Sequence, residues 1–349
     1  MKGRIAVLDR INGREAAALI VNGRLEDLLI DPISDNAPQP GAIYRATSDR
    51  PIKGQNGLIL KLGDGQKGYL RQAKGIAPGT GMLVQVATQV ESGKAAPVVL
   101  KLLFKGRNAI LTPDATGLNI ARSIKDEDER ERLAEIANIA MQDAPDGLGL
   151  ILRSAAALAD GDAILDEIAE LRQTCEGVMA EDINGPPELL VNAPNTHYLA
   201  WRDWSDPDPD QVHENEGGFD DYGVWEMLEA LQQPFVQLPG QASMFIEPTR
   251  ALTAIDVNTG GDFSFAAGLK ANLSAARDLP RQLRLRGIGG QIVIDFAPLG
   301  KKDRRQVELA IGKALRADKI DTNVVGWTPL GHLELQRKRE RIPLGDLLS

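Results

Sequence analysis

The chain has 349 residues, more than the roughly 100 to 200 of a single domain, so we expect two or more hydrophobic cores. Apolar residues make up 43% and charged residues 26% of the sequence, values that exclude wholesale disorder and a fibrous repeat. The sequence has neither an apolar run near the roughly 18 residues of a membrane span nor a signal-peptide pattern, so we expect a cytoplasmic protein. Its single cysteine, Cys175, excludes an internal disulfide and a multi-cysteine zinc site. Any metal would therefore be held by oxygen ligands.

Charge is distributed unevenly along the chain. The net charge is −9, but residues 251–349 carry 16 Lys plus Arg against 11 Asp plus Glu, or +5, which leaves −14 for the first 250 residues. The C-terminal part is therefore the part suited to phosphates. Residues 206–221 hold seven acids and no Lys or Arg, and we predict a loop there.

The first hundred residues read as strands. Three strand-like runs within residues 3–30 are joined at Asn12-Gly13 and Asn22-Gly23, pairs that favour tight hairpins, so we predict a three-stranded meander. Five short strand-like runs follow between residues 42 and 104, broken by Gly and Pro. They indicate a small barrel.

Helices and strands alternate in the rest of the chain, which predicts a layered α/β or α+β core. The expected helices cover residues 123–143, 162–180, 224–232, 265–287 (interrupted by Pro280) and 304–318. The expected strands cover residues 147–154, 291–296 and 323–328, with a strand pair at 244–258.

Two aspartates end apolar runs in the basic part. Asp256 follows LTAI, and Asp295 follows QIVI. Strand alternation places Asn258 on the same face as Asp256, and the two acids converge if their strands are neighbours. Paired carboxylates share a proton or a cation, and hard oxygen ligands suit Mg²⁺. The alternative is that both acids are ordinary turn residues that face water.

Arginines recur on one face of the helix that contains Pro280. Arg277, Arg281 and Arg284 stand at i, i+4 and i+7, and a row of guanidiniums suits phosphates. The alternative is a solvated helix face. The basic run RKRER at residues 337–341 is typical of a solvated tail, although its proximity to the acids favours phosphate contacts.

The stretches ALTAIDVNTGG, NLSAARDLPRQLRLRGIGGQIVIDF and GWTPLGHLELQRKR together resemble the catalytic region of the bacterial ribonuclease E/G family. The likeness is close over about the last 100 residues and looser upstream. It implies an α+β and α/β multi-domain fold: a split ribonuclease-H-like and DNase-I-like catalytic core with an inserted OB-fold RNA-binding barrel and a 5′-sensor region. The implied parts are the meander (1–37), the barrel (38–105), the 5′-sensor region (106–196), the return to the ribonuclease-H-like subdomain (197–222) and the DNase-I-like catalytic subdomain (223–349).

The resemblance also implies roles for individual residues. Asp256 and Asp295 would bind Mg²⁺ with support from Asn258, and Arg281, Arg284 and Arg286 would contact RNA. Arg153 and Ser154 match the family's 5′-monophosphate sensor, and Arg122 lies where a second sensor arginine is expected; the alternative for Arg153 is a strand-end arginine paired with a nearby acid. Tyr69 would offer a base-stacking ring in the barrel, or else be an ordinary core or surface tyrosine, and the other aromatic position expected there falls in the aliphatic run LILKL.

Some features depart from the family pattern. The CPxC zinc link of the larger members is missing, so we expect no zinc-linked dimer, and the oligomeric state stays open. The loop after DVNTGG is shorter and less basic than usual, and Pro280 replaces a helix former. Aromatic residues make up only 4% of the chain, which predicts weaker RNA stacking.

The function that we expect is a magnesium-dependent endoribonuclease that cleaves single-stranded RNA and leaves 5′-phosphate and 3′-hydroxyl ends. One alternative is an RNA-binding protein with weak or lost catalysis. The other is a non-specific or DNA-directed nuclease, because metal-assisted hydrolysis does not require a 2′-hydroxyl.

Overall fold

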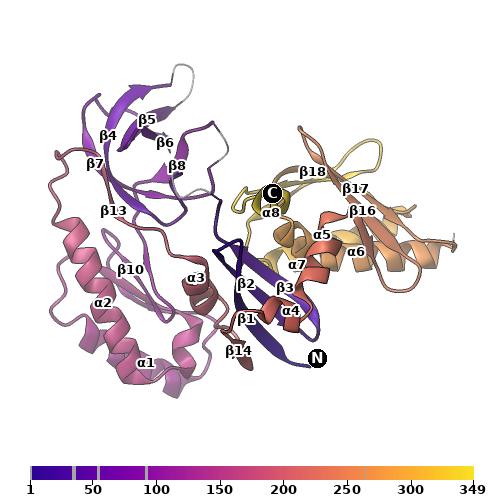
Figure 1. The fold of residues 1–349 in the computed structure, drawn as a ribbon, viewed down its shortest axis with the longest axis horizontal. Coiled ribbons are helices and arrows are strands. Elements are labelled where there is room, and N and C mark those ends of the chain that lie inside the picture. The colour runs from indigo at the N-terminus through magenta and orange to yellow at the C-terminus, as the bar shows by residue number, and fades with distance from the viewer. Residues whose placement is uncertain (1, 34–36, 53–55, 91–92, 263) are drawn as a thin grey trace. The chain divides into compact units, whose positions relative to one another are not determined.

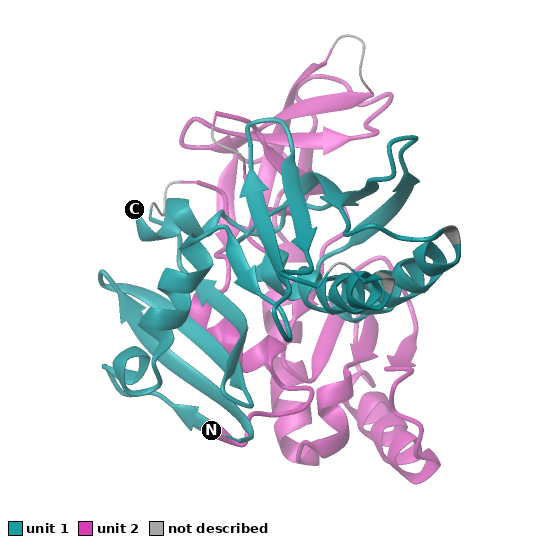
Figure 2. Cartoon of the chain, turned by 90° about the vertical axis from the view of Figure 1, so that its right-hand side faces the viewer, with its two compact units in different colours: residues 1–33, 212–349 teal, residues 34–211 magenta. Residues whose placement is uncertain are grey.

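The structure is a computed structural model that describes residues 2–33, 37–52, 56–90, 93–262 and 264–349. Its contacts divide the chain into two compact units. Unit 1 contains residues 1–33 and 212–349, and unit 2 contains residues 34–211 (Figure 2). Unit 2 is thus inserted into the sequence of unit 1. The finer division into five parts stays a prediction.

The N-terminal meander of unit 1 is confirmed. Strands β1 (Arg4–Ile11), β2 (Arg14–Val21) and β3 (Arg24–Ile30) pair antiparallel in sequence order. Both Asn-Gly turns have positive φ at both residues, 51° and 79° in the first and 52° and 78° in the second. This is the type I′ geometry whose twist matches that of the flanking strands.

The acidic stretch 206–221 is not only a loop, so that prediction was wrong at two places. Strand β14 (Gln211–His213) pairs with the edge of β1, and α4 (Gly218–Asp221) is a short helix. Phe219 is fully buried in the meander core, and its backbone N–H donates to Asp9 Oδ2 at 2.8 Å. The single phenylalanine anchors a segment whose composition otherwise indicates solvent.

A six-stranded mixed sheet forms the rest of unit 1. Its order is β15-β16-β17-β18-β20-β19, with β17 and β18 parallel. Helices α6 (Phe265–Leu285) and α7 (Lys301–Ala317) bury one face, and a short helix α8 (Leu344–Leu348) ends the chain (Figure 1). The helix α5 (Val224–Gln232) precedes this sheet and packs on the meander core. The strands are β15 (Phe235–Gln237), β16 (Ser243–Pro248), β17 (Thr253–Asn258), β18 (Gly290–Asp295), β19 (Thr322–Trp327) and β20 (Leu333–Arg337).

Two local predictions for this region were wrong. Helix α6 runs through Pro280 without interruption, because the buried side chains of Leu279 and Leu283 hold both halves against the sheet. The basic run 337–341 is only partly solvated, because Lys338 and Arg339 are exposed whereas Arg337 is buried. Arg337 ends the inner strand β20, and its side chain is 0% exposed.

Unit 2 begins with the predicted barrel. Strands β4, β5, β6, β8 and β7 pair in this order, and an additional pairing of β4 with β7 closes the ring. This closed five-stranded barrel is consistent with an OB-like domain. Strand β13 (Glu188–Val191) adds to β4 from outside. The barrel strands are β4 (Ile43–Pro51), β5 (Gly57–Gly63), β6 (Gln66–Arg71), β7 (Gly81–Val86) and β8 (Ala96–Val99).

The second half of unit 2 is a small sheet with the two predicted helices. Helix α1 (Glu127–Ala140) starts at Asp126, whose carboxylate accepts the backbone N–H of Glu129, and α2 (Gly161–Met179) packs with it on the sheet. A 3₁₀ turn, η1 (Ser154–Leu158), follows β12, and α3 (Thr196–Asp203) comes last. The sheet order is β11-β12-β10-β9. Its strands are β9 (Phe104–Lys105), β10 (Ala109–Thr112), β11 (Leu118–Ile120) and β12 (Gly149–Leu152).

Within the described ranges, none of the helices has both the length and the apolar character that a membrane span requires.

Candidate active site

The two predicted aspartates lie side by side on the open face of the six-stranded sheet. Strands β17 and β18 are parallel neighbours, and Asp256 and Asp295 are Cα partners in their register. Thr253, Ile255 and Val257 of β17 point into the core, so the alternate residues Ala254, Asp256 and Asn258 face away from α6 and α7. The two strands are therefore neighbours, which was the condition for the two acids to converge. Both carboxylates are exposed.

Two further side chains contact this pair. The Asn258 amide donates to Asp256 Oδ2 at 2.7 Å, which fixes the orientation of that carboxylate. His332 Nε2 lies 3.8 Å from Asp295 Oδ1. The histidine precedes β20, which pairs antiparallel with β18 through Ile294 and Leu333. The sequence signal for His332 was its place directly before the LELQR strand, and we missed it because the pairing of that strand with β18 is not local.

The donor set fits a hard divalent cation. Mg²⁺ is commonly held by one or two carboxylates and keeps several waters, which matches two exposed aspartates on adjacent strands. Among the described residues, no group of three or more His, Cys, Asp and Glu side chains is arranged as a metal cluster. A softer, fully protein-ligated ion is therefore a poorer match than a partly hydrated one. Cys175 belongs to the core of unit 2, where burial raises the pKa of its thiol to about 11.

The arginine row of α6 does not form a solvent face. Arg277 is exposed, but Arg281 is half-buried, and Arg284 and Arg286 are buried. Arg281 pairs with Asp278 and donates to the Leu25 carbonyl oxygen. Arg286 donates to the carbonyl oxygens of Leu231 and Gln233.

Arg284 belongs to a buried charge network, and we define this network as Asp27, Arg284, Asp318, Arg337 and Arg341. Arg284 pairs with Asp27 and Asp318, Arg337 pairs with Asp318 at 2.7 Å, and Arg341 pairs with Asp27 at 2.7 Å. The contacts join β3, α6, the residue that follows α7 and the chain from the end of β20 to Arg341. The guanidiniums of Arg281, Arg284 and Arg286 are already bound inside unit 1. An RNA phosphate would have to replace these partners, and the RNA contacts of the three arginines stay a prediction.

The predicted sensor residues gather at one end of the small sheet in unit 2. Strands β11 and β12 are parallel, with Ile120 opposite Leu152, so Arg122 and Arg153 both follow the same edge of the sheet. Arg122 is exposed. Ser154 is half-buried and begins the 3₁₀ turn η1.

Arg153 is held from two sides. It donates to the Gly106 carbonyl oxygen at 2.6 Å and to Asp203 Oδ1 at 3.2 Å. Asp203 also accepts from Arg202. Burial tends to raise the pKa of Asp203, but its bonds and charge contacts with Arg202 and Arg153 outweigh this effect and lower the pKa. The nearby acid of the alternative interpretation is therefore present, and the side chain of Arg153 is held in place while staying 25% exposed.

Tyr69 stands on the outer surface of the barrel. Its neighbours Gly68 and Leu70 are buried, whereas Tyr69 is half-buried and pairs across the strands with Ile59. The ring covers Gly57, where a Cβ would overlap it, so this glycine makes room for the ring. The Ile59 partner is the aliphatic residue in the run where a second aromatic was expected.

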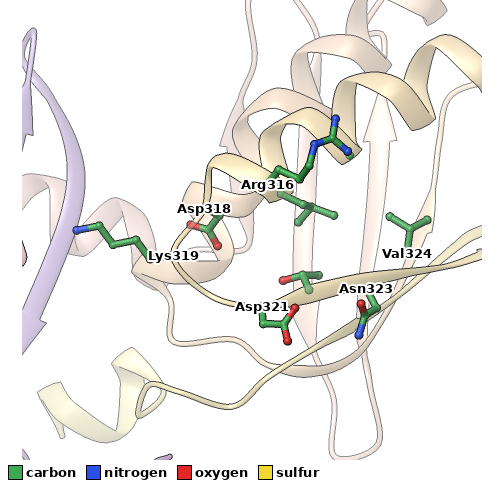
Figure 3. A pocket seen from close by; sticks show the side chains of 9 residues that line it. Arg316, Asp318, Lys319, Asp321, Asn323 and Val324 are labelled. Carbon is green, nitrogen blue, oxygen red and sulfur yellow. The ribbon is translucent and has the colours of Figure 1, made fainter. Parts of the chain in front are cut away.

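A separate pocket of about 430 Å³ lies in unit 1, at the end of the six-stranded sheet opposite to Asp256 and Asp295 (Figure 3). It is lined by the end of α7 and the start of β19, including Arg316, Lys319 and Asn323. Thr322 also lines the pocket. It is the register partner of Arg337 in β20, and Arg337 is the register partner of Gly290, the first residue of β18. Since Asp295 ends β18, the pocket and the acid pair are at opposite ends of the strands. In Figure 3 the Lys319 side chain points away from the other labelled side chains.

Comparisons with known proteins agree on one family. The sequence model of the Ribonuclease E/G family matches residues 104–218 and 210–340. The chain is 29% identical to Ribonuclease E of Nostoc sp. over 381 residues, covering 93% of this chain and 54% of the relative. It is 27% identical to Ribonuclease E of Synechocystis sp. (96% and 57% covered) and 26% identical to Ribonuclease G of Salmonella typhimurium (76% and 61% covered). The chain thus spans little more than half the length of the first two relatives.

Proposed function

The chain belongs to the ribonuclease E/G family, and from this premise we propose that it is an endoribonuclease that hydrolyses single-stranded RNA with the help of Mg²⁺. The observation that carries the proposal is the register pairing of Asp256 with Asp295 on an open sheet face, with Asn258 bonded to Asp256. Both turn-residue and core-residue roles explain this arrangement less well, because the acids are paired with each other across two strands whose other faces are packed.

The chain's own residues would act by charge and position. The carboxylates of Asp256 and Asp295 provide a site of two negative charges, and Asn258 holds one of them in a fixed orientation. When bound there, Mg²⁺ supplies an activated water and neutralises charge on the phosphate oxygens. The open sheet face leaves room for an extended RNA strand, and in-line attack on its phosphodiester leaves 5′-phosphate and 3′-hydroxyl products.

Further parts of the proposal concern the rest of the chain. The closed barrel would bind RNA on the outer surface that carries Tyr69, where the exposed Lys61 and Lys67 pair across the same two strands. Arg153, Ser154 and Arg122 would bind a 5′-monophosphate. We also propose that the meander with β14 and α4 is the ribonuclease-H-like part and that the six-stranded sheet with α6 and α7 is the DNase-I-like part of the five-part division.

One experiment separates this function from its alternatives. The purified chain is incubated with labelled single-stranded RNA, double-stranded RNA and single-stranded DNA of the same sequence, with Mg²⁺ or with EDTA. Cleavage of single-stranded RNA that is abolished by EDTA supports the proposal. Binding without cleavage identifies an RNA-binding protein, and equal cleavage of DNA identifies a non-specific nuclease.

A further inference from the structure

An aromatic pair lies in the same cross-strand row as the two aspartates. Phe235 of β15 is the register partner of Phe245 of β16, and Phe245 is the register partner of Asp256. With the pairing of Asp256 and Asp295, four side chains from four consecutive strands form one line across the sheet. Directly paired residues point to the same face of a sheet, so the two rings share the open face with the acids.

Burial confirms which face the rings occupy. Met244 and Ile246, which flank Phe245, are buried in the core, and so is Val236 beside Phe235. Phe245 is half-buried, while Phe235 is 46% exposed. The ring centroids are 5.5 Å apart with an interplanar angle of 69°, an edge-to-face contact. This contact fixes the ring of Phe235 and leaves much of its surface accessible.

The strand spacing places both rings within about 10 Å of the strand that carries Asp256. Adjacent strands lie about 4.8 Å apart, so Phe245 is about 5 Å and Phe235 about 10 Å from the strand of Asp256. An exposed phenylalanine at this distance from a phosphate-cleaving site offers a π-face to the base next to the scissile phosphate. Base–aromatic stacking is a main source of affinity for single-stranded nucleic acid.

We propose that Phe235 and Phe245 form a stacking subsite for a nucleobase that flanks the scissile phosphate. The proposal rests on the proposed function and names a substrate contact that the family resemblance does not supply. The low aromatic content of the chain predicted weak stacking of RNA bases. In the barrel Tyr69 pairs with the aliphatic Ile59, whereas the six-stranded sheet carries two rings in register with Asp256.

The test is a double-mutant cycle that measures the coupling in RNA affinity between one side chain and one base. The full chain in EDTA is titrated with a fluorescent single-stranded RNA, and with copies of it that lack a single base at successive positions. The variants are Phe235→Leu, which keeps an apolar side chain without a ring, and Phe235→Tyr, which keeps the ring. Leu309→Ala removes an exposed apolar side chain from α7 and serves as the matched control.

The expected result is specific to the ring. Phe235→Leu should raise Kd about tenfold, in the range of one base stack, whereas Phe235→Tyr and Leu309→Ala should stay within about twofold. Removal of the base at one position should raise the Kd of the parent about tenfold. It should leave the Kd of the Phe235→Leu variant almost unchanged, because the ring that stacks on that base is already absent. Equal affinity of parent and Phe235→Leu, or additive losses at every position, would overturn the subsite.

Two further readouts separate this proposal from others. If the parent binds RNA with the expected coupling but does not cleave it in Mg²⁺, the proposed function fails, whereas the stacking contact between Phe235 and a nucleobase stands. If the parent cleaves RNA and Phe235→Leu cleaves it with an unchanged KM, the subsite fails and the function stands. If light scattering shows that Phe235→Leu changes the assembly mass while RNA affinity is unchanged, the rings contact protein and the proposal is overturned.

Discussion

Asp256 and Asp295 are Cα partners in adjacent parallel strands although 39 positions (295 minus 256) separate them in the sequence. Parallel strands need a crossover, and here helix α6 provides it. The helix packs on the closed face of the sheet through residues such as Ala275 and Leu279. The open face therefore keeps the two carboxylates together and accessible.

Replacing either acid should abolish catalysis but not RNA binding. Asp256→Asn and Asp295→Asn each remove one negative ligand, so cleavage should fall at least about hundredfold while Kd for RNA stays within about threefold. Asp321→Asn is the matched control, because Asp321 is exposed at the other end of the same sheet. Manganese binding measured by electron paramagnetic resonance should weaken in the two active-site variants only. Turnover within about threefold of the parent in either variant would contradict the site.

Asn258 should act through Asp256. Asn258→Leu keeps the size of the side chain but removes the donor to Asp256 Oδ2, so the carboxylate loses its fixed orientation. Loss of a group that orients a metal ligand typically lowers metal affinity or activity about 10 to 100-fold. We expect a comparable loss of kcat and of manganese affinity, with an unchanged melting temperature. An unchanged manganese affinity together with an unchanged kcat would show that the amide has no positioning role.

The sensor prediction concerns the 5′ end of the substrate. A monophosphorylated RNA should be cut faster than its 5′-hydroxyl counterpart, because the Arg153 guanidinium supplies charge-assisted hydrogen bonds to the phosphate. In Arg153→Ala the two substrates should be cut at similar rates. Lys313→Ala, which removes an exposed cation from α7, should keep the preference. The rates are compared over a salt series, and a preference present only at low salt would indicate general attraction instead of a shaped site.

The buried charge network predicts how stability depends on pH. Burial tends to raise the pKa of Asp27, but Arg341 and Arg284 outweigh it and lower the pKa well below the ordinary value. A carboxylate with a lowered folded-state pKa stabilises the protein above its unfolded pKa of about 4, and this contribution is lost as the pH falls below that value. Urea unfolding from pH 7 to pH 3 should therefore show falling stability below about pH 4.5.

Asp27→Asn isolates this contribution. The substitution leaves buried guanidiniums short of a negative partner, and breaking such a pair costs about 3 to 5 kcal/mol. The variant should be less stable at pH 7 and should depend less steeply on pH below 4.5 than the parent. Asp221→Asn, at a largely exposed carboxylate, should match the parent in urea unfolding. A parent-like midpoint for Asp27→Asn would mean that the network contributes little.

Several features were predictable because their signals are local. The two Asn-Gly pairs determine the meander, since both residues of each pair take the positive φ of a type I′ turn. The apolar runs LTAI and QIVI predicted the strands that carry Asp256 and Asp295. Asp295 ends β18 as expected, whereas β17 continues past Asp256 to Asn258. Short-range patterning of this kind is read directly from the chain.

The tertiary structure alone decided which charged and aromatic side chains are available to a substrate. In the sequence Arg284 resembles a solvated phosphate ligand, yet it is buried beside Asp27 and Asp318, and Phe219 gives structure to a stretch that reads as a loop. Phe235 and Phe245 carried no functional signal until the register aligned them with Asp256. The sequence by itself determined the strands, the turns and the residues at the ends of the strands, because these depend on near neighbours. Burial and cross-strand register depend on residues far apart in the chain, and only the folded packing sets them.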